Sequence, residues 1–174
     1  MKTSGDLFYI NLSFDDFKLG GSAFAQTLNR IGNETPSVRD SKFFKDSFNL
    51  VQSLINDGAI FSGHDISSGG LISCLLEMCF SSLNVGMKID LTNLNCNDSI
   101  KLLFSENSGI ILQSDQNLDK IFNEIGVECS KIGETIISNE LNILNFEDNY
   151  VFDINHYRDI CYSTSRDFDQ KQTK

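Results

Sequence analysis

The sequence has no tryptophan, one proline and only two histidines among its 174 residues. With His64 and His156 as the available imidazoles, a metal site built on histidines is not expected. None of the five cysteines forms a CxxC pair, which argues against a zinc site and against a disulfide framework. We therefore expect reduced thiols that are mostly packed in the core, where free cysteines usually lie.

Positive charge is also scarce, because 14 basic residues face 24 acidic ones and the formal net charge is −10. Sequence-independent binding to nucleic acid or to an anionic membrane needs a basic surface, so neither partner is expected. The longest apolar stretch, residues 71–80, is far shorter than the roughly 20 residues that cross a bilayer. The first residues lack the apolar core and cleavage site of a signal peptide, which predicts a cytoplasmic protein.

Common catalytic signatures are missing as well. The sequence contains no GxSxG element, no P-loop and no GxGxxG fingerprint. Cys74 and Cys79 are five residues apart, about 140° around a helix with 3.6 residues per turn, which indicates core positions rather than a shared site. Nucleophilic catalysis is therefore not indicated.

The length and the 40% apolar content suit one globular domain and are too small for two ordinary ones. Hydrophobic periodicity predicts helices at residues 23–29, 41–56, 71–80 and 117–125, and strands at residues 6–12, 59–62, 85–91, 109–113 and 126–133. Residues 135–137 and 141–144 suggest a terminal hairpin. Because strands and helices interleave without regular βαβ spacing, we predict an α+β fold, a layered α/β sandwich with a mixed β-sheet. This domain is expected at residues 1–145, with a polar tail at residues 146–174.

Two segments place small residues directly before a predicted helix, LGGS at residues 19–22 and DISSGG at residues 65–70. Uncrowded backbone N–H groups and the positive end of a helix can together surround a phosphate. Ser22 is in addition a candidate N-cap. The alternative is that each glycine pair only forms a tight turn.

Four further polar positions have both a functional and a structural interpretation. His64 and Asp65 are neighbours on an extended segment, so their side chains point to opposite faces and a direct pair is not expected. Each could bond a ligand separately, or Asp65 could form an Asx turn with the N–H of Ser67. Glu106 interrupts two apolar segments, either as a ligand-facing carboxylate or as a solvated loop acid, and Glu77 has neighbours apolar enough for it to bond across the domain.

Four segments, read in order, resemble one family, phosphoribosylformylglycinamidine synthase, the glutamine-dependent enzyme of purine biosynthesis. They are LGGSAFAQ (residues 19–26), VQSLI (51–55), HDISSGGL (64–71) with Glu77 and Met78 after it, and LFSE (103–106). The match is to the second of the two aminoimidazole-ribonucleotide-synthetase-like (AIR-synthetase-like) C-terminal domains of the large form. Residues 159–165 resemble the segment that leads to the glutaminase domain of that enzyme.

The resemblance implies the fold of an AIR synthetase C-terminal domain and a part in an ATP- and glutamine-dependent ligase that converts formylglycinamide ribonucleotide to formylglycinamidine ribonucleotide. The implied partners are a companion N-terminal AIR-synthetase-like domain, the glutaminase domain and the ribonucleotide phosphate. ATP and magnesium would belong to the full-length enzyme, with none held tightly by this chain, which we expect to be inactive alone. The implied substrate- or phosphate-binding residues, none of them catalytic and none a metal ligand, are Gly20, Gly21, Ser22, His64, Asp65, Ser67, Ser68, Gly69, Gly70 and Glu106.

One position departs from the family pattern, because Ser68 stands where many relatives have aspartate. The loss of that charge puts a metal or ribose role there in doubt and eases the approach of a phosphate. The sequence leaves two alternatives to this interpretation open. The chain could be a non-catalytic packing domain, or a domain of another ATP-dependent enzyme of the superfamily, similar to selenophosphate synthetase or to a hydrogenase-maturation protein.

Overall fold

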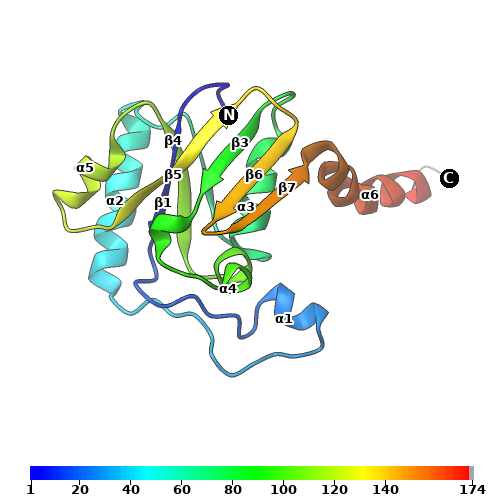
Figure 1. Cartoon of the computed structure of the whole chain (residues 1–174), viewed down its shortest axis with the longest axis horizontal. Coiled ribbons are helices and arrows are strands. Elements are labelled where there is room, and N and C mark those ends of the chain that lie inside the picture. The colour runs from blue at the N-terminus through cyan, green and yellow to red at the C-terminus, as the bar shows by residue number, and fades with distance from the viewer. Residues whose placement is uncertain (173–174) are drawn as a thin grey trace.

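The computed structural model describes residues 1–172 and contains one seven-stranded sheet (Figure 1). The strand order is β2-β4-β1-β5-β3-β6-β7, in which β3 and β6 are parallel and the other neighbours antiparallel. The predicted mixed sheet is therefore confirmed. The strands are β1 (Asp6–Asn11), β2 (Ser62–Asp65), β3 (Gly86–Asp90), β4 (Gly109–Ser114), β5 (Cys129–Ile136), β6 (Glu140–Asn145) and β7 (Asp148–Asp153).

Helices cover the two faces of the sheet unequally. The helices are α1 (Ala23–Thr27), α2 (Ser41–Asn56), α3 (Gly70–Phe80), α4 (Ser99–Phe104), α5 (Leu118–Asn123) and α6 (Ile154–Gln172), with a 3₁₀ turn at Thr92–Leu94. One core cluster joins α3 and α4 to the sheet, and a second joins α2 and α5 to β1 and β4. On the second face, β3, β6 and β7 have no helix over them (Figure 1).

Helix α2 was predictable from local signals, and its predicted span, residues 41–56, is confirmed. Asp40 caps it by accepting the N–H groups of Lys42 and Phe43 at 2.9 and 3.0 Å. Its inner face buries Val51 and Leu54 against the sheet. Spacing of three and four residues thus identified the face that packs.

The second strand lies three residues later than predicted, at Ser62–Asp65 instead of residues 59–62. Ala59 belongs to the lead-in, where its carbonyl accepts the Ser114 hydroxyl at 2.8 Å and its side chain is buried. Pairing with β4 begins only afterwards and includes His64 and Asp65. Apolar content identified the buried lead-in, whereas the register was decided by the partner strand.

The predicted hairpin of residues 135–137 with 141–144 is wrong, because β3 lies between β5 and β6. A Cβ on Gly86 would overlap the carbonyl oxygen of Glu140, so a glycine at the start of β3 lets the β5–β6 connection pass close by. The hairpin in this part of the fold is β6–β7. The strand predicted at residues 126–133 is displaced to Cys129–Ile136.

The polar end of the chain is more ordered than its composition suggested. β7 joins the sheet, and α6 then runs from Ile154 to Gln172 and leaves the body of the domain (Figure 1). Ile154 is buried and Tyr162 contacts Phe80, with ring centroids 6.0 Å apart. Residues 173 and 174 of the predicted tail lie outside the described residues. Among the helices formed within residues 1–172, none has the length and apolarity to cross a membrane.

Candidate functional site

The loop before α3 is shaped by two glycines with positive φ, +91° at Gly69 and +75° at Gly70. A Cβ on Gly70 would lie 2.7 Å from the carbonyl oxygen of Leu103, and one on Gly69 would overlap the Ser73 hydroxyl. Both positions therefore exclude a side chain on steric as well as conformational grounds. The glycine pair allows the start of α3 to approach the end of α4 closely.

The carboxylate of Glu106 joins two segments that are distant in sequence. Its Oε1 atom accepts the Gly69 N–H at 2.8 Å and the Ala23 N–H at 2.8 Å. Gly69 is the N-cap residue of α3 and Ala23 is the first residue of α1. One anion thus satisfies donors at two helix N-termini, where backbone N–H groups have no partner within the helix.

The amides of the LGGS segment are used within the fold. Gly20 N–H donates to Glu34 O at 2.8 Å, Gly21 N–H to Ile31 O at 2.8 Å, and Ser22 N–H to Leu19 O at 3.1 Å. The predicted capping role of Ser22 is confirmed, because its hydroxyl oxygen accepts the Ala25 N–H at 3.2 Å. These backbone donors are therefore not available to a ligand in this conformation.

A buried polar cluster joins the two ends of the segment that carries α1, near Lys18 and Arg39. Asn107 donates to Ser13 Oγ at 3.1 Å and to Asp16 O at 2.9 Å, and its side-chain oxygen accepts the Lys18 N–H at 3.3 Å. The Asp15 carboxylate is paired with the Lys18 ammonium at 2.7 Å and with Arg39. The Lys18 contact and Arg39 together lower the pKa of Asp15 to about 2. Sequence patterns did not indicate Asn107, because its partner Ser13 lies 94 residues away, and they did not indicate the pairing of Asp15 with Arg39.

Ser67 and Ser68 are exposed at the entrance to α3. Among the described residues, neither their backbone N–H groups nor their hydroxyls make a hydrogen bond, although Ser67 O accepts the Gly70 N–H at 3.1 Å. The N-cap residue of α3, Gly69, has no side chain, and Glu106 bonds its N–H, so the serines lie beside a helix end whose first donor is already taken. The predicted loop residues therefore divide into glycines that shape the turn and serines that offer free donors.

His64 contacts both α3 and its sequence neighbour: its Nδ1 atom lies 3.8 Å from Asp65 Oδ1, although no direct pair of these side chains was expected. Its Nε2 atom lies 3.1 Å from Glu77 Oε2, and its Nδ1 atom lies 2.7 Å from Asp65 O. Glu77 thus bonds across the domain, as its apolar neighbours indicated. It lies seven residues beyond Gly70, about 10 Å along the helix axis, so the ring of His64 is turned away from the Gly69 amide.

The cysteines near this region are not activated. Cys74 and Cys79 on α3 are buried, and burial raises the pKa of each thiol to about 12, with Asp65 and Glu77 adding to the effect at Cys74. All five cysteines are free thiols, of which Cys74, Cys79 and Cys129 are buried as expected, Cys96 is half-buried and Cys161 is exposed. Within residues 1–172, no three His, Cys, Asp or Glu side chains are grouped so that they could hold a metal ion.

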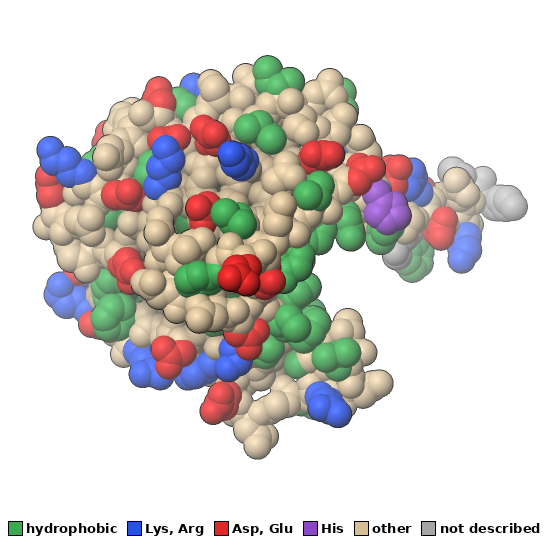
Figure 2. All heavy atoms as spheres, viewed as in Figure 1, with side chains coloured by type: hydrophobic (Ala, Val, Ile, Leu, Met, Phe, Trp, Pro, Cys, Tyr) green, Lys and Arg blue, Asp and Glu red, His purple; other side chains and the backbone are tan. Residues whose placement is uncertain are grey.

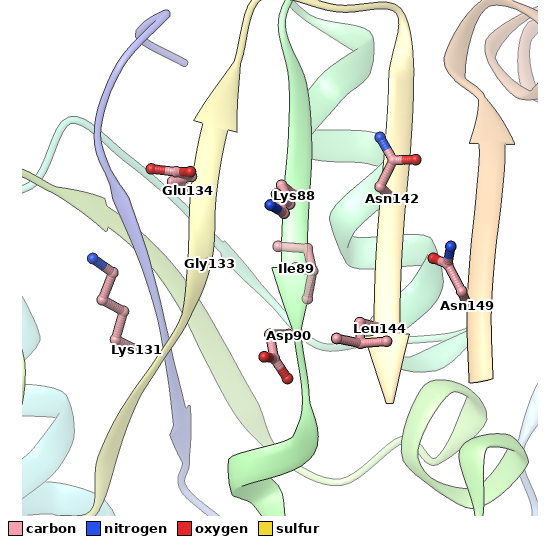
Figure 3. A pocket seen from close by; sticks show the side chains of 9 residues that line it. All are labelled: Lys88, Ile89, Asp90, Lys131, Gly133, Glu134, Asn142, Leu144 and Asn149. Atoms are coloured by element: carbon pink, nitrogen blue, oxygen red, sulfur yellow. The ribbon is translucent and has the colours of Figure 1, made fainter. Parts of the chain in front are cut away.

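A hollow of about 530 Å³ lies on the open face of the sheet, away from these loops. Lys88, Asp90 and Asn142 point into it from β3 and β6, and Lys131 and Glu134 flank it on β5 (Figure 3). Acidic and basic side chains are interspersed over this face (Figure 2). A mixed polar face of this kind is what a sheet presents to water, so the hollow is not the candidate site.

The candidate site is thus the corner of an α+β domain at which Glu106 ties the start of α1 to the glycine-rich entrance of α3. Residues 4–143 match the family described as AIR synthase related protein, C-terminal domain. The chain belongs to this family.

Relatives and solved structures agree with that assignment. The chain is 37% identical over 137 residues to a probable phosphoribosylformylglycinamidine synthase of Caenorhabditis elegans, and 33% identical over 135 residues to the Homo sapiens phosphoribosylformylglycinamidine synthase. These matches cover 72% and 75% of the chain but 10% of each relative. The chain therefore spans about a tenth of the length of the curated relatives it matches.

The fold is similar to that of Thermotoga maritima PurL complexed with FGAR, with a TM-score of 0.66 and 14% identity. The match covers 88% of the chain and 27% of PurL. The complex of the same protein with ATP matches with a TM-score of 0.64 and 12% identity, over 88% of the chain and 25% of PurL. The expected AIR synthetase C-terminal fold is thus confirmed.

Proposed function

We propose that this chain is the C-terminal AIR-synthetase-like domain of a phosphoribosylformylglycinamidine synthase, the second of two such domains in the large form. It contributes substrate-binding loops to a carbon–nitrogen ligase of purine biosynthesis. In that reaction ATP activates the formyl-amide oxygen of formylglycinamide ribonucleotide, and ammonia from glutamine displaces the phosphate. The names of the relatives support the activity, and the names of the PurL complexes support ATP and FGAR as ligands of the full-length enzyme.

The observation that carries this proposal is the bond of one Glu106 oxygen to both Ala23 and Gly69. It brings the LGGS, SSGG and LFSE segments to one place, although they are separated by up to 83 residues. Segments that match one family and converge on a single carboxylate form a site more readily than three separate turns would.

Within this site we assign the ribonucleotide phosphate to Ser67 and Ser68. Their N–H groups and hydroxyls are free, they are exposed, and they adjoin the positive end of α3. Gly69, Gly70 and Glu106 then shape and fix the loop, and Gly20, Gly21 and Ser22 fix the docked α1 segment. His64 and Asp65 lie on the strand that enters the loop.

Magnesium and ATP are assigned to the rest of the enzyme. The described residues offer no group of side chains suited to a metal ion, and the sequence has no P-loop. The companion N-terminal domain and a glutaminase would supply these groups and the ammonia. The chain alone should therefore turn over nothing, and glutamine- and ATP-dependent product formation by the isolated 174 residues would contradict this.

The phosphate assignment can be tested by titrating the ¹⁵N-labelled chain with inorganic phosphate and with ribose 5-phosphate. We expect the amide signals of Ser67 to Gly70 to shift, and a Ser68→Asp variant to bind about fivefold more weakly because a like charge faces the anion. Ser165→Asp, an equally exposed change on α6, is the matched control. Absence of shifts at this loop at saturating ligand would remove the phosphate role.

A packing function is the second candidate, and one observation favours it. The LGGS amides and the Gly69 amide are already bonded within the fold, as they would be in a domain whose loops only dock a neighbour. The titration separates the two candidates, because a packing domain predicts no ligand-dependent shift at Ser67 or Ser68.

A further inference from the structure

The edge of the sheet formed by β2 is open. β2 pairs with β4 on one side and has no strand on the other. Ile66 N–H, just past β2, donates to Gly109 O at 2.8 Å. Because alternate residues of an antiparallel strand bond to the same neighbour, Gly63 and Asp65 direct their N–H groups away from β4. Two backbone donors thus face outward along this edge.

Helix α2 lies beside this edge and exposes apolar side chains there. Phe48 and Ile55 are 45% and 47% exposed, and Gln52 lies between them on the same side of the helix. A hollow of about 410 Å³ lies between α2 and the edge, walled by Val51, Ile55, Ile60, Ile110 and Leu112. A Cβ on Gly63 would lie 2.9 Å from Leu112 Cδ2, so the strand carries a glycine where Leu112 approaches it. The apolar side chains around this hollow could therefore pack against one more strand at the edge.

The charge beside the hollow restricts what can fill it. Asp65 lines the same hollow as Gly63, two positions away on the same face of β2, and its side chain is 78% exposed. A strand laid antiparallel to β2 would place one side chain opposite Asp65. The side chain two residues further along that strand would then lie opposite Gly63. The first should be basic, and the second should be a β-branched apolar residue that enters the hollow.

We infer that this edge binds an extended segment of a partner protein as an eighth strand, antiparallel to β2, with the pattern Lys or Arg, any residue, then Val or Ile. Backbone bonds to Gly63 and Asp65 supply affinity, while the hollow and the Asp65 carboxylate supply specificity. This surface is distinct from the Ser67–Ser68 donors, and the inference does not depend on the proposed function.

The probes are two synthetic peptides with blocked ends, Thr-Lys-Thr-Val-Thr-Thr and the same peptide with Glu in place of Lys. Each is titrated into the ¹⁵N-labelled full chain. We expect the lysine peptide to shift the amide signals of Gly63, Asp65 and residues 48–55, and to bind about fivefold more tightly than the glutamate peptide. On an Asp65→Lys variant this preference should reverse.

Two further variants test the hollow. Ile55→Ser should weaken the lysine peptide, whereas Ile137→Ser, an 80%-exposed isoleucine outside the hollow, should not. No shift at Gly63 with either peptide would overturn the inference. So would equal binding of the two peptides to the wild type and to the Asp65→Lys variant. Shifts at Gly63 that depend on protein concentration without peptide would show a second copy as the occupant and would overturn it too.

Discussion

Glu106 and Gly69, 37 residues apart in sequence, are joined by a 2.8 Å hydrogen bond from the Gly69 amide to the Glu106 carboxylate. The same oxygen accepts the Ala23 amide. Phe24, the next residue, stacks on Phe104 with ring centroids 4.6 Å apart. The short helix α1 is therefore held by one carboxylate and one aromatic contact, and both contacts come from the end of α4 and the residues just after it.

Replacing this carboxylate should loosen both attached segments. In Glu106→Ala two partly buried N–H groups lose a charged acceptor, and we expect the free energy of unfolding to fall by about 2–3 kcal/mol. Glu106→Gln keeps an acceptor and should lose about half as much. Urea unfolding measures both, with Glu124→Ala at an exposed position as control. Equal stability of Glu106→Ala and wild type would show that the bonds contribute nothing to the fold.

Gly70 should be far less tolerant of alanine than a glycine of the same backbone conformation in open space. Gly126 has φ +74°, almost the value at Gly70, but a Cβ there would meet nothing within 4 Å. Gly126→Ala therefore reports the conformational cost alone, about 1 kcal/mol. Gly70→Ala adds overlap with Leu103 O and should cost about 3 kcal/mol or more in thermal or urea unfolding. Similar losses at the two sites would contradict the close approach of α3 and α4.

What the sequence predicted correctly was local. The periodicity of α2 and the Ser22 cap depend on residues within one or two turns, so they can be predicted without knowing a tertiary partner. The placement of β3 between β5 and β6 depends on a neighbour about 50 residues away, and the adjacent runs looked like a hairpin. Local pattern cannot decide between such pairings.

The same contrast between local patterns and contacts of distant residues holds at the candidate site. Glycines and serines before a helix indicated an anion-binding corner, but the anion found there is the side chain of Glu106. Glu106 was selected from its place between two apolar segments and from the family resemblance, but its two backbone partners could not be inferred from spacing. Asn107 carried no signal, because a single buried amide is distinguishable from a loop residue only when its partners are known.

Low pH should weaken the ion pairs of Asp15 at the ends of the segment that carries α1. Because the pKa of Asp15 is lowered to about 2 by Lys18 and Arg39, its contribution to stability is complete above the unfolded value of 3.8 and is lost as the pH falls through about 2. We expect the stability difference between wild type and Asp15→Asn to be constant near neutral pH and to shrink below about pH 4. Urea unfolding across this range measures it. The exposed change Asp115→Asn serves as control, and a difference that grows towards low pH would contradict the pairing.

Thiol reactivity should separate Cys161 from the core cysteines. Cys161 is exposed on α6, whereas Cys74, Cys79 and Cys129 are buried. Burial raises the pKa of all three buried thiols, so the reactive thiolate is scarce as well as inaccessible. With excess iodoacetamide at about pH 8, mass spectrometry should find one rapid modification at Cys161, a slower one at the half-buried Cys96, and the other three only after unfolding. Cys161→Ser should abolish the rapid phase. Rapid labelling of Cys74 in the folded chain would instead mean that α3 opens from the sheet, because no packed arrangement of that helix leaves its inner face in reach of the reagent.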